Sequence, residues 1–80
     1  MNKKELAKYY GELYIMLKEL FSSLEHLVDV VEDKRAKGMD VKRMEVECDL
    51  LYSTYINARS IVNREVRELG IQSLVEAYGD

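Results

Sequence analysis

The chain has 80 residues, which is enough for one domain with a small hydrophobic core. It contains no proline, no tryptophan and four glycines, so the residues that interrupt helices are scarce. The net charge of −3 at pH 7 argues against a general nucleic-acid coat. The single cysteine excludes an intrachain disulfide scaffold and favours a reducing, cytoplasmic setting.

The first half of the chain carries an unbroken heptad seam. Its apolar residues follow one another at alternating spacings of four and three: Leu6, Tyr10, Leu13, Leu17, Leu20, Leu24, Leu27 and Val31. With Leu6 at d and Tyr10 at a, this pattern predicts one helix over residues 3–37. Asn2, followed three residues later by Glu5, is a suitable amino-terminal cap. Charged residues interrupt the apolar stretches, so we expect neither a signal peptide nor a membrane span.

A short turn is predicted at residues 38–40. Gly38 can adopt the left-handed conformation that ends a helix, and Asp40 can cap the next one. Met39 and Met44 stand at the two positions of a hydrophobic staple. So short a connection predicts that the helices run antiparallel.

A second seam follows the turn and predicts a helix over residues 41–69. Its members are Val41, Met44, Cys48, Leu51, Tyr55, Ala58, Val62 and Leu69, with an interruption at Glu65. Gly70 predicts another left-handed helix ending that lets Ile71 contact Val66. Ser73 and Glu76 match a capping box, so we expect a short helix over residues 73–78 that covers the open end of the hairpin with Leu74, Val75 and Tyr78.

These elements define the fold class as all-α: residues 1–80 form a single domain, an antiparallel hairpin of two long helices plus a short C-terminal helix. The e and g positions of the first helix are also apolar, apart from Ser23. Four apolar positions in seven make a face wide enough for two neighbours, and the short third helix covers only part of it. We therefore expect a homodimeric four-helix bundle, with the interface residues Tyr14, Met16, Phe21, Val28 and Val30. The alternative is that the band is kept for another protein.

The second half of the second helix is rich in arginine and lies beside the tyrosines of the open end. Tyrosine and arginine dominate binding hot spots, because each combines a large contact area with a directional polar group. The candidate partner-binding residues are Tyr9, Tyr10, Tyr14, Ile56, Arg59, Asn63, Arg64 and Arg67. They favour a non-enzymatic homodimer that binds another protein.

The alternative function is nucleic-acid binding through the same arginines, as in the ROP-type bundle of paired hairpins, a likeness of shape without a shared motif. Binding of the first helix to a membrane surface is the weakest hypothesis, because its polar face is acidic.

Other constellations carry no predicted chemistry. The basic cluster at residues 33–43 is interpreted as a solvated tip in which Asp33 pairs with Lys37, since six carboxylates lie just below it. His26 stands on the outer face, and Cys48 at an a position is interpreted as a small buried hydrophobe. We expect no catalytic, metal-binding or cofactor-binding residues.

Overall fold

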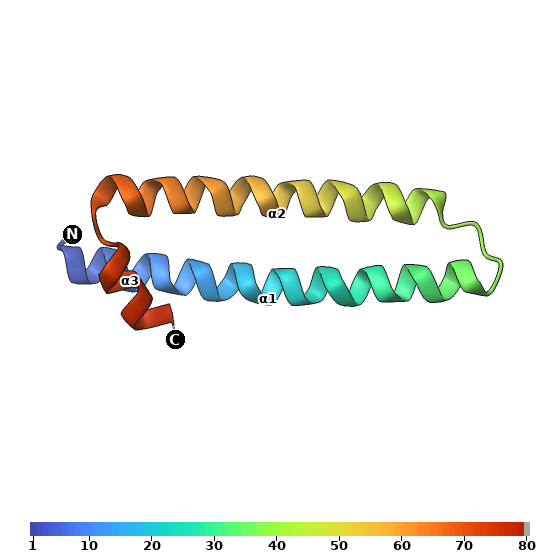
Figure 1. Ribbon diagram of the computed structural model, residues 1–80, viewed down its shortest axis with the longest axis horizontal. Coiled ribbons are helices and arrows are strands. Elements are labelled where there is room, and N and C mark those ends of the chain that lie inside the picture. Colours follow the sequence, from blue (N-terminus) through green and yellow to red (C-terminus); the bar gives the residue numbers. More distant parts are fainter. Residues whose placement is uncertain (80) are drawn as a thin grey trace.

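The computed structural model describes residues 1–79, which form three helices and no strand (Figure 1). They are α1 (Lys3–Ala36), α2 (Lys42–Leu69) and α3 (Gln72–Gly79). The two long helices pack antiparallel in a rod of 54 × 20 × 16 Å, and α3 crosses α1 near its amino-terminal end. The predicted all-helical hairpin is confirmed.

The ends of α1 follow the capping signals in the sequence. The Glu5 backbone N–H donates to Asn2 Oδ1 at 2.9 Å, and the Asn2 amide donates back to Glu5 Oε1 at 3.3 Å. At the other end Gly38 has φ +82°, a conformation that costs an L side chain energy. It lets the Met39 N–H donate to the Lys34 carbonyl at 3.1 Å, which closes the last turn.

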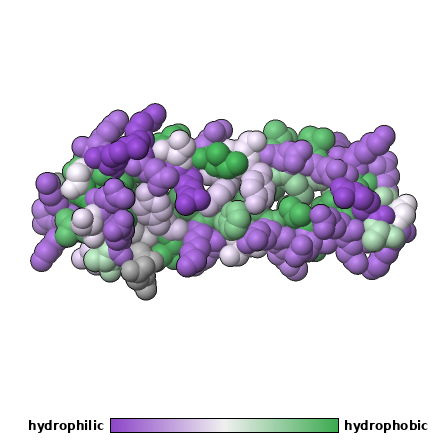
Figure 2. All heavy atoms as spheres, in the orientation of Figure 1, coloured by the Kyte–Doolittle hydropathy of each residue, from purple (hydrophilic) through white to green (hydrophobic). Residues whose placement is uncertain are grey.

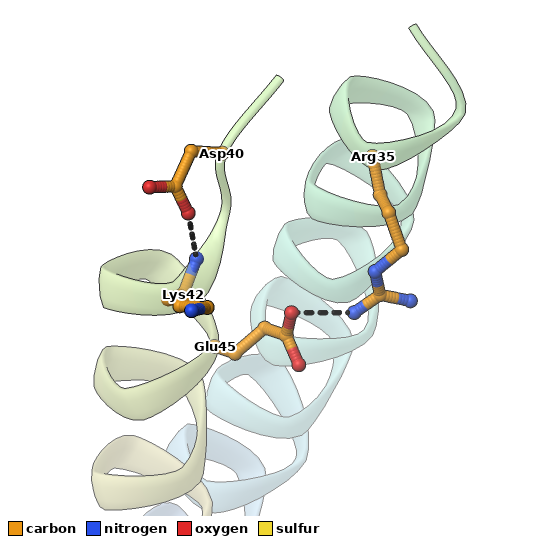
Figure 3. Close-up of polar contacts among 4 residues, drawn as sticks. All are labelled: Arg35, Asp40, Lys42 and Glu45. Atoms are coloured by element: carbon orange, nitrogen blue, oxygen red, sulfur yellow. Dashed lines mark hydrogen bonds and ion pairs between the residues drawn. The ribbon is translucent and has the colours of Figure 1, made fainter. Parts of the chain in front are cut away.

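The turn differs from its prediction in two details (Figure 3). Helix α2 begins at Lys42, so Asp40 stands one residue outside the cap position and accepts a hydrogen bond from the Lys42 N–H at 3.1 Å. Met39 is 48% exposed and does not form the predicted staple; Val41 is buried and packs with Met44 instead. Val41, rather than Met39, is thus the residue of the turn that is buried in the turn-end core.

The end of α2 confirms the predicted glycine ending, whereas the start of α3 does not follow the predicted capping box. Gly70 has φ +65°, and the Ile71 N–H donates to the Val66 carbonyl at 3.3 Å. Because Ile71 is the most buried large side chain, with 1% exposure, its burial sets the start of α3 at the next residue. Ser73 consequently lies inside the helix rather than at its cap.

The core consists of two separate clusters. At the open end Ala7, Val66, Ile71 and Val75 are buried together, and at the turn end Val31, Val41 and Cys48 are buried together. Helix α3 approaches α1 closely because position 11 is glycine: a Cβ there would lie 2.9 Å from Tyr78 Cβ.

Helix α3 buries less of its own surface than the sequence predicted. Of the three covering residues, only Val75 is buried; Leu74 and Tyr78 remain 38% and 48% exposed. Tyr78 contacts α1 at Gly11 through its Cβ and stays half exposed, whereas Ile71 and Val75 are buried in the open-end core.

Three seam leucines are more exposed than the heptad pattern predicted. Leu20, Leu51 and Leu69 are 39%, 45% and 40% exposed, although Leu24 in the same seam is buried. Helix α3 contacts the e and b side of α1, at Ala7 and Gly11. No element within residues 1–79 covers the g side, so Leu20 and Leu51, which stand at d positions beside it, stay in solvent. Leu69 stands at an a position and is the last residue of α2.

Candidate functional site

One side of the hairpin carries a continuous groove beside α3. We call this side the groove face; it is formed by the e and b positions of α1 and α2 together with α3. Three hollows of about 540, 330 and 400 Å³ lie along it. Each shares lining residues with the others; the shared residues are Tyr14, Tyr55, Arg59, Asn63 and Arg67.

Tyr14 stands where the hollow beside α3 meets the hollow along α1. Its hydroxyl donates a hydrogen bond to Asn63 Oδ1. Burial raises the pKa of the Tyr14 phenol, while the positive charge of Arg59 acts in the opposite direction. The phenol is therefore neutral at physiological pH and held across the two long helices.

An aromatic cluster forms the middle of the groove face. The ring of Phe21 lies 5.3 Å from that of Tyr55 and 6.0 Å from that of Tyr52, distances at which edge and tilted contacts are favourable. These contacts fix the wall against which Arg59 lies in the hollow along α1.

Charge is divided along the groove face. The open-end hollows contain Lys18, Arg59 and Arg67, and among residues 1–79 Glu76 is the single carboxylate that lines them. Among residues 1–79, none of these three cations forms an ion pair. Since unpaired arginines can donate to carboxylate or phosphate oxygens in a fixed geometry, this half of the face can hold an anionic group beside aromatic surface.

Toward the turn the same face becomes acidic. A smaller hollow of about 150 Å³ is lined by Glu32, Glu45 and Asp49, and by Arg35. Arg35 pairs with Glu45 at 2.9 Å (Figure 3). The groove face is thus basic at its open end and acidic at its turn end.

Five of the eight predicted partner-binding residues come together in this groove: Tyr14, Ile56, Arg59, Asn63 and Arg67. Tyr10 is instead packed against the open-end core, and its hydroxyl donates to Glu65 Oε2 at 2.7 Å, which raises the pKa of the Tyr10 phenol. Tyr9 stacks on Tyr10 and is 47% exposed. Arg64 stands at a c position, on the far side of α2.

The residues predicted for the dimer interface divide between two sides. Tyr14, Phe21 and Val28 line hollows of the groove face. Met16 and Val30 stand at g positions, on the side away from α3, where Met16 is 62% exposed. The five residues therefore do not form one surface.

Sequence reasoning missed Lys18 and Tyr55 as groove residues. Tyr55 was assigned to the seam, and it is 93% buried, yet its exposed edge lines two hollows. Lys18 follows Tyr14 by four residues, a spacing that puts both on one side of a helix and could have pointed to it.

The remaining candidates have structural roles. Cys48 is a buried free thiol in the turn-end core, and Asp33 pairs with Lys37 at 3.0 Å, as predicted for the basic tip. Within the described residues, no helix combines the length and hydropathy of a membrane span, and no three acidic, histidine or cysteine side chains are grouped for a metal.

Fold and site define a small all-helical hairpin with an aromatic and basic groove on one side. No protein-family model, curated protein or solved structure matches the chain.

Proposed function

We propose that this chain is a non-enzymatic, homodimeric interaction protein that binds another protein through the open-end half of the groove face. The observation that carries the proposal is that three hollows adjoin at shared lining residues, among them Tyr14, Arg59 and Arg67. Aromatic walls supply contact area, and the arginines supply directional donors at its edge. Such a surface fits a helical or extended segment with carboxylate side chains.

Nucleic acid is the rival ligand for the same arginines. Few cations line the groove, and the acidic turn-end hollow with Glu32, Glu45 and Asp49 lies on the same face. Asp49 lies ten residues from Arg59 on α2, about 15 Å along the helix, so a phosphate backbone extended along the groove would run onto these carboxylates and be repelled. A short protein segment avoids them, which favours a protein ligand.

The test compares the wild type with an Arg59→Ala, Arg67→Ala double variant. Tagged chains capture partners from nuclease-treated extract of the native host, and the affinity of each captured protein is then measured. We expect the double variant to lose about tenfold or more in affinity, because an arginine that acts as a binding hot spot costs more than about 1 kcal/mol when it is truncated.

Lys3→Ala with Lys8→Ala is the matched control, since it removes two exposed cations from α1 and leaves the groove intact. A double arginine variant that stays helical and binds the same protein with unchanged affinity would refute the assignment. Affinity that falls steeply with salt and disappears on nuclease treatment would instead favour nucleic acid.

A further inference from the structure

The side of the hairpin opposite α3 carries an uncovered apolar surface. We call it the apolar face and define it by Tyr9, Met16, Leu20, Leu51 and Ile61, which are 39–62% exposed. Tyr9 and Met16 stand at g positions of α1. Ile61 stands at one of the four g positions of α2, and the other three are the polar residues Glu47, Thr54 and Glu68. In an antiparallel pair the g positions of both helices turn to the same side, so these residues form one band.

Apolar surface is not confined to this face: on the side of α3, which the hydropathy view shows, green patches also lie among purple side chains along the rod (Figure 2). Leu20 and Leu51 belong to the seam but stand at d positions beside the g residues, and they are about as exposed as those residues. Large apolar side chains that gather on one exposed face mark an interaction site.

The outer edges of the apolar face carry opposite charge on the two helices. These edges are the c positions, all of them exposed: Glu5, Glu12, Glu19, His26 and Asp33 on α1, and Arg43, Leu50, Asn57 and Arg64 on α2. Near the turn Asp33 and Arg43 have ion pairs within their own helices. Within residues 1–79, Glu12 and Arg64 have none.

Contacts between the long helices fix which residues stand at the same height. The bonded pairs are Tyr10 with Glu65 and Tyr14 with Asn63. Glu12 lies midway between the two tyrosines and is therefore level with Arg64. By the same register Met16 is level with Ile61, and Ser23 is level with Thr54.

We propose that a second copy of this chain docks on the apolar face with its turn at the same end, so that α1 of each copy packs against α2 of the other. The inference rests on the homodimer of the proposed function and adds its interface and orientation. A two-fold axis parallel to the helices leaves heights unchanged. Glu12 of one copy then meets Arg64 of the other, and at the g positions Met16 meets Ile61 and Ser23 meets Thr54. The two outer g pairs bring the exposed carboxylates Glu68 and Glu47 beside Tyr9 and Val30.

The other way to stack the same faces is disfavoured by charge. A two-fold axis across the middle of the rod would pack α1 against its own copy. The acidic edge of α1 would then lie on itself, with Glu19 near the middle of the helix facing Glu19 of the second copy. Like charges opposite each other are destabilising, whereas the parallel axis matches acid with base.

Charge reversal tests the interface at low ionic strength, with sedimentation equilibrium as the measurement. Glu12→Arg alone and Arg64→Glu alone should each raise the dimer dissociation constant about tenfold, because each change creates two repulsive contacts per dimer. The two changes combined in one chain restore both contacts with their signs exchanged, so the double variant should dimerise like the wild type. Arg67→Glu is the matched control: it lies one turn along on the groove face and should leave dimerisation unchanged.

Orientation is tested without altering the charged edges. In a Cys48→Ala background, Met39→Cys carries a nitroxide label at the turn, and the distance between labels is measured by pulsed electron resonance. Turns at the same end give a distance well below the 54 Å length of the rod, and turns at opposite ends give a distance close to it.

The outcomes separate the two proposals. A wild-type chain that remains monomeric at all concentrations would overturn the homodimer of the proposed function and this inference together. A dimer with its turns at opposite ends, or one indifferent to the reversals at Glu12 and Arg64, would overturn this inference and leave the homodimer standing.

Discussion

Tyrosine hydroxyls join α1 to α2 at the open end, and their ionisation links the hairpin to pH. Tyr10 donates to the Glu65 carboxylate at 2.7 Å. That bond, together with burial, raises the pKa of the Tyr10 phenol above the value of about 10 expected in the unfolded chain. The folded state therefore favours the protonated phenol, so the contribution of this bond is complete below pH 10 and is lost as pH rises through the folded pKa.

Replacing this hydroxyl should flatten the alkaline limb of the stability curve. We expect Tyr10→Phe to lower the free energy of unfolding by about 1 kcal/mol at neutral pH, since it removes a bond to a charged acceptor. Above pH 10 the difference from the wild type should shrink. Urea unfolding across the alkaline range measures it, and Tyr9→Phe, which alters the neighbouring stacked ring, is the control. A difference that stays constant through pH 11 would contradict the assignment.

Helix α3 is held by the buried side chains of Ile71 and Val75, and it contributes more to the stability of the fold than its length suggests. Ile71 is 1% exposed between Ala7, Val66 and Val75, whereas Leu74, three residues later, is 38% exposed. Ile71→Ala and Leu74→Ala remove the same number of carbon atoms from the same end of the chain. The pair therefore compares the same truncation at a buried and at an exposed position.

We expect Ile71→Ala to lower the free energy of unfolding by about 2–4 kcal/mol and Leu74→Ala by about 1 kcal/mol or less. Chemical denaturation gives both values, and hydrogen exchange shows whether the α3 amides lose protection first. Equal losses for the two variants would mean that α3 is not docked as described. Because small domains have little stability in reserve, the larger loss should also lower the melting temperature visibly.

The sequence predicted the helices well because their signals are local. Heptad spacing and capping residues act within a few positions of the chain. Asn2 caps the start of α1, and Gly38 and Gly70 follow the ends of α1 and α2, as expected. The capping box at Ser73 failed because a tertiary contact, the burial of Ile71, outweighed a local preference.

The site was predicted only in part, because it depends on which side of the hairpin α3 takes. Tyr14 at e and Met16 at g were equal candidates for the same interface in the sequence. The path of the chain after Gly70 brings α3 to the e side, which makes a groove around Tyr14 and leaves Met16 exposed. No local pattern encodes that choice.

At the scale of the whole molecule, the rod has two small cores and an uncovered band between its ends. The middle of the hairpin is filled by Leu24 and the aromatic cluster of Phe21, Tyr52 and Tyr55, but Leu20 and Leu51 are exposed there. In the proposed dimer the second copy covers them, so folding and association become linked and apparent stability depends on protein concentration.

Exchanging Leu20 and Leu51 for glutamine should remove that linkage. In an isolated chain each change should cost about 0.5 kcal/mol or less, because surface substitutions are usually that small. In the dimer each leucine lies in the interface twice, so the double variant should lose most of its association and its melting temperature should no longer rise with concentration.

Ile56→Gln is the control: Ile56 is 55% exposed on the groove face, and its loss should leave the concentration dependence intact. Thermal unfolding monitored by circular dichroism over a wide range of concentrations decides the matter. A wild-type melting temperature that is the same at every concentration would contradict the dimer. It would mean that a monomer tolerates the exposed leucines and that the groove face alone binds a partner.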